Sequence, residues 1–267
     1  MIMPCVIIFV GILLYYGLAL PGCLQITHHD VYVKGLPKAF EGLTIVQLSD
    51  IHQNIWTRPG RVRQIVKQVN AMHPDITLLT GDYISKGKAN IDPVGKALFG
   101  LKAKYGVYAV LGNHDYWTDG PHMAKALRGS GIDVLINENR RIVAGKDHIW
   151  LAGFDDIWAG NPDYERGLAG VPTDDFCIAM AHNPDAALAL GDTPVSFLMS
   201  GHMHGGVINL PKYGSIFKYL WHARFISGLY KVGHLQLYVS SGIGDNLMAI
   251  RFRCHTELPV FVLHGTN

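Results

Sequence analysis

The sequence predicts a layered α/β fold, with either one mixed sheet or two sheets packed together, and with helices on the outside. In the first half of the chain, short apolar runs alternate with stretches whose apolar residues recur at helical spacing. In the second half, apolar runs follow one another with fewer helical stretches between them. No internal repeat, low-complexity linker or second domain boundary follows residue 30.

The first half supplies the alternating elements. The apolar runs LTIVQLSD (43–50), ITLLTGD (76–82) and GVYAVLGNHD (106–115) predict three buried strands. After the first strand, an apolar stripe at i, i+3, i+4 and i+7 starts at Val62 and predicts an amphipathic helix that ends before Pro74. A similar pattern at 94–101 predicts a second helix.

The second half is richer in strands. A weaker helix is expected near 123–127, and a short helix is expected after Pro184. The remaining apolar runs predict strands at 132–137, 140–145, 148–156, 176–182, 195–202, 235–242 and 258–264.

Composition limits the function. The chain has 267 residues, of which 49% are hydrophobic, so one domain of roughly 240 residues with a short extension is expected. The formal net charge is only +2 and no dense Lys/Arg block occurs, so nucleic acid is not expected as a partner. The 4 cysteines show no CxxC spacing, which disfavours a disulfide framework and a thiolate zinc site.

The first 24 residues contain no charged side chain. A helix of about 22 residues would be ~33 Å long and would cross a hydrocarbon core of ~30 Å, so residues 1–27 are expected to form a membrane anchor. A cleaved signal peptide would need a basic start, which is absent here, and a lipoprotein site at Cys23 or a buried helix is less favoured than the anchor. The nearest cations, Lys34 and Lys38, follow the anchor and favour a cytoplasmic domain on the bacterial inner membrane.

Side chains that can bind a metal ion, namely Asp, Asn and His, follow five of the predicted strands. Because ligands bind outside the carboxyl ends of strands in α/β sheets, these residues are expected to meet at one edge. Carboxylate, amide and imidazole donors without cysteine suit Mn, Fe or Zn, and the donors are numerous enough for two ions. Glycines in GHMHGG (201–206) let the backbone and the ions approach closely. The five motifs are Asp50-Ile51-His52, Gly81-Asp82, Gly112-Asn113-His114-Asp115, His182-Asn183 and Gly201-His202-Met203-His204.

These motifs, in this order, resemble the signature of the calcineurin-like metallophosphoesterases. The segments LPKAFEGLTIVQLSDIH, AHNPD and GHMHGG…LPKYG are similar to the bacterial membrane-associated branch of YkuE-like and YaeI-like phosphodiesterases. The resemblance covers about residues 30–265 and places the phosphoesterase domain at 28–267. It implies a four-layer α-β-β-α sandwich of two mixed sheets flanked by helices, with a dinuclear metal centre.

The resemblance also implies a role for each site residue. Asp82 bridges the two ions, and His114, oriented by Asp115, stabilises the transition state or protonates the leaving oxygen. The first ion takes Asp50, His52, Asp82 and His204, and the second takes Asp82, Asn113, His182 and His202.

The sequence departs from the narrower branch at three positions. That branch commonly has Gln and Arg where Val207 and Asn209 stand, and Arg where Ser241 stands. The predicted ligands are unaffected, but cations that could hold a phosphate or fix a loop are absent from these positions.

Two interpretations remain open for the aromatic residues that follow the motifs. They either serve packing and membrane-interface anchoring, or they form an apolar wall for the lipid or nucleotide part of a substrate. The residues are Tyr116, Trp117, Trp158, Phe217, Tyr219 and Trp221.

The expected function is two-metal hydrolysis of a phosphodiester or pyrophosphate bond in a membrane-associated or lipid-linked substrate. Mn is the expected metal, and Fe, Zn or Mg could replace it. The related branch includes an enzyme that cleaves the pyrophosphate of UDP-2,3-diacylglucosamine. The competing hypotheses are a phosphomonoesterase, a non-catalytic scaffold and a metal-storage protein, and the last two do not require His114. The oligomeric state is not predicted.

Overall fold

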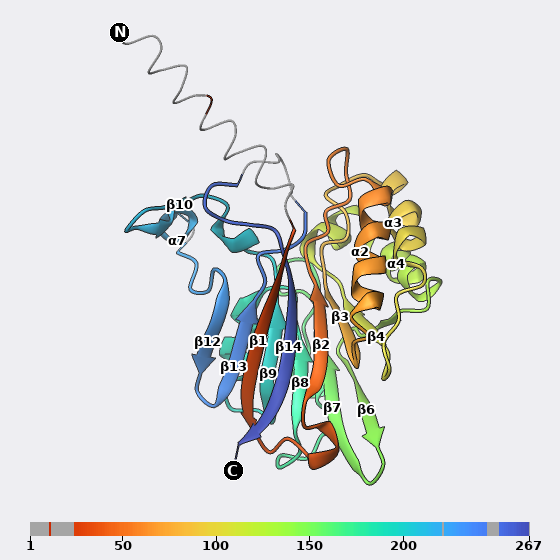
Figure 1. The fold of residues 1–267 in the computed structure, drawn as a ribbon, viewed down its shortest axis with the longest axis vertical. Coiled ribbons are helices and arrows are strands. Elements are labelled where there is room, and N and C mark those ends of the chain that lie inside the picture. Colours follow the sequence, from red (N-terminus) through yellow and green to blue (C-terminus); the bar gives the residue numbers. More distant parts are fainter. Residues whose placement is uncertain (1–10, 12–23, 221, 245–250, 267) are drawn as a thin grey trace.

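The fold is built from two facing sheets. The computed structural model describes residues 11, 24–220, 222–244 and 251–266, and within them two six-stranded mixed sheets pack face to face with helices outside (Figure 1). This arrangement confirms the predicted α/β fold of mixed sheets flanked by helices.

The first sheet joins the two ends of the domain. Strand β14 lies between β1 and β2, parallel to β1 and antiparallel to β2, so β1 begins at the edge where β2 ends. Strands β2 to β5 are parallel, and three helices cover the outer face. The strands are β1 (Gln25–Lys34), β14 (Glu257–Thr266), β2 (Leu43–Leu48), β3 (Ile76–Thr80), β4 (Val107–Val110) and β5 (Asp133–Val134), and the helices are α2 (Pro59–Ala71), α3 (Ile91–Leu98) and α4 (Asn113–Arg128).

The second sheet has a parallel centre and antiparallel edges. Strands β7, β8, β9 and β13 run parallel, whereas β6 and β12 pair antiparallel with β7 and β13. Its elements are β6 (Glu138–Ala144), β7 (Asp147–Gly153), β8 (Cys177–Met180), β9 (Val195–Ser200), β13 (Leu235–Val239), β12 (Gly228–Val232), α5 (Tyr164–Gly167) and α6 (Ala187–Leu190).

Apolar side chains fill the spaces between the layers. Leu78, Leu151 and Phe197 belong to the buried cluster between the two sheets. On the outer face of the first sheet, the predicted stripe of α2, from Val62 to Val69, packs against buried residues of β2 and β3. Because both faces of these strands are buried, their sequences are continuous apolar runs rather than alternating ones.

Short elements surround the carboxyl ends of the parallel strands. Residues 207–220, which we call the flap, follow η6 and contain β10, β11 and α7, and Figure 1 shows β10 and α7 at the end of the molecule where β1 begins. These elements are η4 (Lys88–Asn90), η5 (Pro184–Ala186), η6 (His204–Gly206), β10 (Asn209–Leu210), β11 (Gly214–Ser215) and α7 (Ile216–Leu220), whereas η3 (Lys38–Phe40) lies before β2, at the opposite end of the sheets.

The expected elements are present, with differences at their boundaries. The third predicted strand ends at Val110, because its polar end, from Asn113 onward, already belongs to α4. Strands β1 and β12 were not predicted from the sequence.

The predicted membrane anchor falls mainly on residues that the structure does not describe. Within the described ranges, no helix combines the length and apolar character needed to cross a bilayer. Residues 1–10 and 12–23 lie outside those ranges, and β1 already begins at Gln25.

Candidate metal centre

Asp50 and His52 leave the end of β2 on a strained path. Both residues have positive φ angles, 50° and 44°, which side chains other than glycine seldom adopt. The Ser49 hydroxyl donates to Asp50 Oδ2 at 2.5 Å, and the His202 N–H donates to the same carboxylate at 3.1 Å. A side chain at Gly201 would collide with this carboxylate, so glycine is required there.

Asp82 lies at the centre of the cluster. Its Oδ2 is 3.4 Å from His52 Nε2 and 3.3 Å from His182 Nε2, so one carboxylate oxygen faces both groups of histidines. The second carboxylate oxygen, Oδ1, accepts the His114 N–H at 2.9 Å. A Cβ atom at Gly112 would overlap this carboxylate, which again explains a glycine beside the site.

The first half of the centre contains Asp50, His52 and His204. The Nε2 atoms of the two histidines are 3.0 Å apart, and Asp50 Oδ1 lies 3.6 Å from His204 Nε2. One donor atom from each of the three residues falls within 4.8 Å of the other two, a spacing that fits a single cation.

The second half contains Asp82, His182 and His202, whose donor atoms also fall within 4.8 Å of one another. His202 Nδ1 lies 3.2 Å from His182 Nε2, and the Thr80 carbonyl holds His182 Nδ1 at 2.7 Å. Asn113 directly precedes His114, whose N–H binds the Asp82 carboxylate. The buried Oδ1 of Asn113 has no hydrogen-bond partner among the described residues, as expected for an oxygen that binds a metal ion.

The charges of the site also suit a cation. Burial lowers the pKa of His52 to about 3 and that of His202 to about 4, and it is the largest cause that keeps the pKa of His204 well below its usual value. These rings are neutral at pH 7 and keep a lone pair. Burial also lowers the pKa of His182, but the carboxylates around it, with Asp82 foremost, together outweigh burial and raise this pKa to about 10. A bound cation would take the place of that proton.

The donor set therefore fits two divalent ions. Facing imidazole nitrogens at 3.0 and 3.2 Å repel unless a proton or a cation lies near them. Oxygen and imidazole donors without thiolates are typical of Mn, Fe and Zn sites. The structure brings all seven predicted ligands to one edge of the sheets, five of them buried and the two GHMH histidines half-buried.

His114 sits beside the centre at the start of α4. Its ring meets the His52 ring edge-on, with centroids 4.9 Å apart, and the Ser85 carbonyl lies 2.8 Å from its Nδ1. The carboxylate of Asp115 accepts the backbone N–H groups of Gly112, Asp82 and Tyr83 at 2.9–3.0 Å. The Ser85 carbonyl is thus one contact that orients His114, and Asp115 holds together the two loops that carry the candidate centre.

A sequence model of the calcineurin-like phosphoesterases matches residues 43–206, the span that contains all of the predicted ligands. The chain belongs to the calcineurin-like phosphoesterase family. It is 34% identical over 251 residues to the metallophosphoesterase YkuE of Bacillus subtilis, and the match covers 92% of this chain and 88% of YkuE.

Two further relatives have names that state an activity. The phosphodiesterase YaeI of Escherichia coli is 28% identical, over 91% of this chain and 89% of YaeI. The UDP-2,3-diacylglucosamine pyrophosphatase LpxG of Chlamydia trachomatis is 27% identical, over 72% of this chain and 72% of LpxG.

A buried arginine that the sequence did not single out lies beside the candidate metal centre. Arg251 is 1% exposed and donates to the carbonyls of Ser241 and Gly244 at 2.7 and 2.6 Å. Its Nη2 is 3.4 Å from His204 Nδ1. Arg251 therefore supplies a cation next to Ser241, one of the positions where the narrower branch commonly has arginine, and it ties this loop to a predicted ligand.

A buried aspartate of the phosphoesterase supports the loop after β7. Asp156 Oδ1 accepts the N–H groups of Trp158 and Ala159 at 2.9 and 2.8 Å. The Trp158 ring packs edge-on against His202, with centroids 4.3 Å apart. The GFDD sequence before Trp158 could have indicated this supporting role of Asp156, because an aspartate at the end of an apolar run often caps the following turn.

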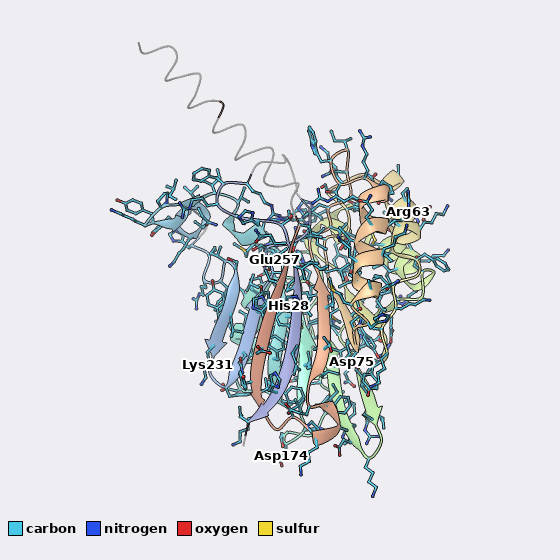
Figure 2. The ribbon with its side chains drawn as sticks, viewed as in Figure 1. His28, Arg63, Asp75, Asp174, Lys231 and Glu257 are labelled. Carbon is cyan, nitrogen blue, oxygen red and sulfur yellow. The ribbon has the colours of Figure 1, made fainter. Side chains whose placement is uncertain are left out.

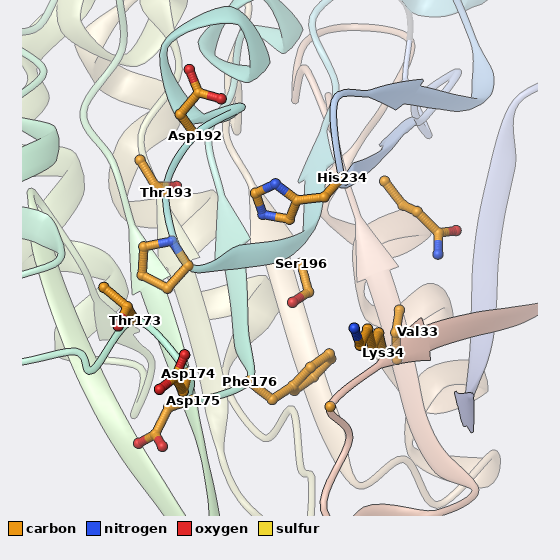
Figure 3. A pocket seen from close by; sticks show the side chains of 13 residues that line it. Val33, Lys34, Thr173, Asp174, Asp175, Phe176, Asp192, Thr193, Ser196 and His234 are labelled. Atoms are coloured by element: carbon orange, nitrogen blue, oxygen red, sulfur yellow. The ribbon is translucent and has the colours of Figure 1, made fainter. Parts of the chain in front are cut away.

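A separate cavity of about 380 Å³ lies at the opposite end of the sheets (Figure 3). Its lining includes Asp174 before β8, Asp192 before β9 and His234 between β12 and β13, with none of the predicted ligands. This cavity is therefore separate from the candidate metal centre.

Proposed function

We propose that this phosphoesterase hydrolyses a phosphodiester or pyrophosphate bond with two divalent ions, in a membrane-associated or lipid-linked substrate. The observation that carries the proposal is Asp82 Oδ2, which lies 3.3–3.4 Å from the histidines of both halves of the centre. The ligands are those assigned above: Asp50, His52, Asp82 and His204 to one ion, and Asp82, Asn113, His182 and His202 to the other.

When bound, two such ions neutralise charge on a phosphoryl group and activate water for in-line attack. The protein then has to deliver a proton to the leaving oxygen. The contact between His114 Nδ1 and the Ser85 carbonyl supports this role for His114, because the carbonyl can only accept, so Nδ1 donates and Nε2 remains for proton exchange. Asp115 acts as a positioning residue through its bonds to the backbone of Asp82 and Gly112.

Two exposed tryptophans favour a diester over a monoester. Trp117 packs edge-on against His114, with centroids 4.9 Å apart, and Trp158 packs against His202. Trp117 and Trp158 are 61% and 59% exposed. They flank the half-buried His114 and His202, on the side from which a phosphate would approach the centre. A diester or pyrophosphate has a second substituent that can cover these rings, whereas a monoester has none.

The lipid-linked character and the location are part of the proposal. LpxG, by its name, acts on a diacylated sugar nucleotide, and the uncharged residues 1–24 suit a membrane anchor. We propose that the residues before β1, 1–24, tether the enzyme to the bacterial inner membrane with the domain on the cytoplasmic side; the expected limit of residue 27 is too late, because Gln25 already pairs in β1. The donor set, which combines amide and carboxylate oxygens with imidazoles, favours Mn, although Fe, Zn or Mg could replace it.

The test compares substrates on one preparation. The full-length protein, purified in detergent and stripped of metal, is loaded in turn with Mn, Fe, Zn or Mg. Rates are measured on bis(p-nitrophenyl) phosphate, p-nitrophenyl phosphate and lipid-linked pyrophosphates, with Asp82→Asn as the inactive control. Faster hydrolysis of diesters or pyrophosphates supports the proposal. Faster hydrolysis of p-nitrophenyl phosphate would show that the enzyme is a monoesterase instead. Equal rates in the wild type and in Asp82→Asn would show that the activity does not come from this centre.

A further inference from the structure

Exposed apolar side chains gather around the metal centre. Ile55 and Trp56, in the loop that follows the Asp50-Ile51-His52 motif, are 73% and 58% exposed. Trp117 and Trp158 extend the same rim over His114 and His202. All of the exposed tryptophans in the described part of the chain lie at this end, and exposed apolar side chains that gather in one region mark an interaction surface, whereas scattered ones do not.

The flap adds exposed apolar side chains at the same end of the molecule. It follows the GHMH ligands directly, and α7 packs against η6, which begins at His204. Tyr213, Tyr219 and Leu220 are 69%, 61% and 66% exposed, although they belong to a folded segment. The flap is fixed to the domain by main-chain hydrogen bonds between Val207, Asn209 and Phe252.

The charge of the flap is of one sign. Lys212 and Lys218 are exposed beside the aromatic residues, and the sequence has no Asp or Glu from residue 193 to residue 244. Exposed tyrosine and leucine interleaved with lysine suit an anionic lipid surface, where the rings sit at headgroup level and the ammonium groups meet phosphates. A protein partner would need acidic groups at positions that match the lysines. In a bilayer, anionic headgroups can move to the lysines, so no such match is needed.

The course of the chain places the proposed anchor at the same end. Strand β1 runs antiparallel to β2 through their common neighbour β14, so Gln25 lies at the end where β2 delivers Asp50. The uncharged residues 1–24 therefore join the domain on the side of the flap, and Figure 2 shows the flap side chains at the end opposite to Asp174. A surface docked through the flap would lie beside the metal centre.

We propose that the flap, residues 207–220, is a docking surface for the anionic face of a lipid bilayer. Tyr213, Tyr219 and Leu220 enter the headgroup layer, and Lys212 and Lys218 bind its phosphates. Docking itself does not depend on the proposed hydrolysis. If that hydrolysis holds, docking brings the centre to headgroup depth and selects phosphates of membrane lipids over soluble ones.

The experiment places a photoreactive residue in the flap of the full-length chain. Tyr219→p-benzoylphenylalanine is compared with Tyr32→p-benzoylphenylalanine, because both tyrosines are 61% exposed and Tyr32 lies near the far end of β1. Each variant is reconstituted in vesicles of phosphatidylethanolamine and phosphatidylglycerol and irradiated. We expect lipid adducts at position 219 in at least tenfold excess over position 32, measured by mass spectrometry.

A charge variant tests the role of the lysines. Lys212→Gln with Lys218→Gln should weaken docking about fivefold for each lysine, or about 25-fold together, and lower the adduct yield at position 219. Lys34→Gln with Lys146→Gln, at the opposite end, is the matched control and should not change it. The same measurement in Asp82→Asn should still give the adduct, which separates docking from catalysis.

Equal adduct yields at positions 219 and 32 would overturn the proposal. Adducts of position 219 with a second protein chain in place of lipid would also overturn it, and would assign the flap to a protein interface. An adduct yield unchanged by the Lys212 and Lys218 substitutions would remove the anionic surface as the partner.

Discussion

Replacing His114 by alanine should separate the chemical step from metal binding. The side chain contributes a ring contact to His52 and a hydrogen bond to the Ser85 carbonyl. The bond that reaches Asp82 Oδ1 comes from the His114 backbone N–H, at 2.9 Å, and alanine keeps it. The bridging carboxylate should therefore stay in place, and the variant should hold both metals.

The expected loss follows from the role of the imidazole. A positioned general acid contributes ~10²–10⁴-fold to rate, or about 3–5 kcal/mol of activation free energy. His114→Ala should lose rate by this factor on alkyl phosphodiesters, whose leaving alkoxide needs a proton. The loss should be much smaller on bis(p-nitrophenyl) phosphate, because p-nitrophenolate leaves without protonation.

The assay measures kcat/KM on both substrates together with metal content by elemental analysis. His122→Ala is the matched control, since His122 lies in the same helix but pairs with Asp92, away from the centre. Full activity of His114→Ala on alkyl diesters would refute the general-acid role. Loss of a metal ion from this variant would show instead that His114 is a ligand.

Four further predictions concern the centre and the anchor. Asp82→Asn should lose one or both ions and nearly all activity, and retention of two ions in elemental analysis would contradict its bridging position. Gly112→Ala should also lose metal, because its methyl group meets the Asp82 carboxylate, whereas Gly60→Ala, with nothing closer than 3.9 Å, should bind metal normally. Full-length protein should stay in the membrane pellet after a high-salt wash, whereas the wash should release a chain that lacks residues 1–23. Release of both proteins would exclude the tether. Burial lowers the pKa of His202 to about 4, so the unfolded state binds the extra proton below pH 6.5 and the folded state does not. The free energy of unfolding of the metal-free protein should therefore fall from pH 7 to pH 5. The fall should be larger in the wild type than in His202→Gln, by up to about 2 kcal/mol. If denaturant titrations gave both proteins the same pH dependence, His202 would not be held neutral in the folded state.

The sequence by itself predicted the fold class and the set of candidate ligands. Apolar runs of strand length marked β2, β3, β8 and β9, and each run ended in a carboxylate or an imidazole. Because the carboxyl ends of parallel strands meet at one edge, the local motifs were enough to bring distant residues together. Asp82 and His182, 100 positions apart in sequence, lie 3.3 Å apart for this reason.

The sequence did not predict the pairing of the chain ends. Strand β1 reads QITHHDVYVK, in which polar and apolar residues are mixed, and it is buried mainly through Val31 and Val33. Its partner β14 lies more than 200 residues later, and no local pattern reports so distant a pairing.

Only the tertiary structure decided how the site residues are held. Asp50, His52, Asp82, His202 and His204 all have positive φ, against the local preference of their residue types. Surrounding bonds impose this backbone, among them those from Asp115 to the neighbouring loops and from Arg251 to the loop beside His204. A sequence motif specifies which side chains reach the strand ends, but their final geometry depends on contacts between segments far apart in the chain, and these exist only once both sheets have packed.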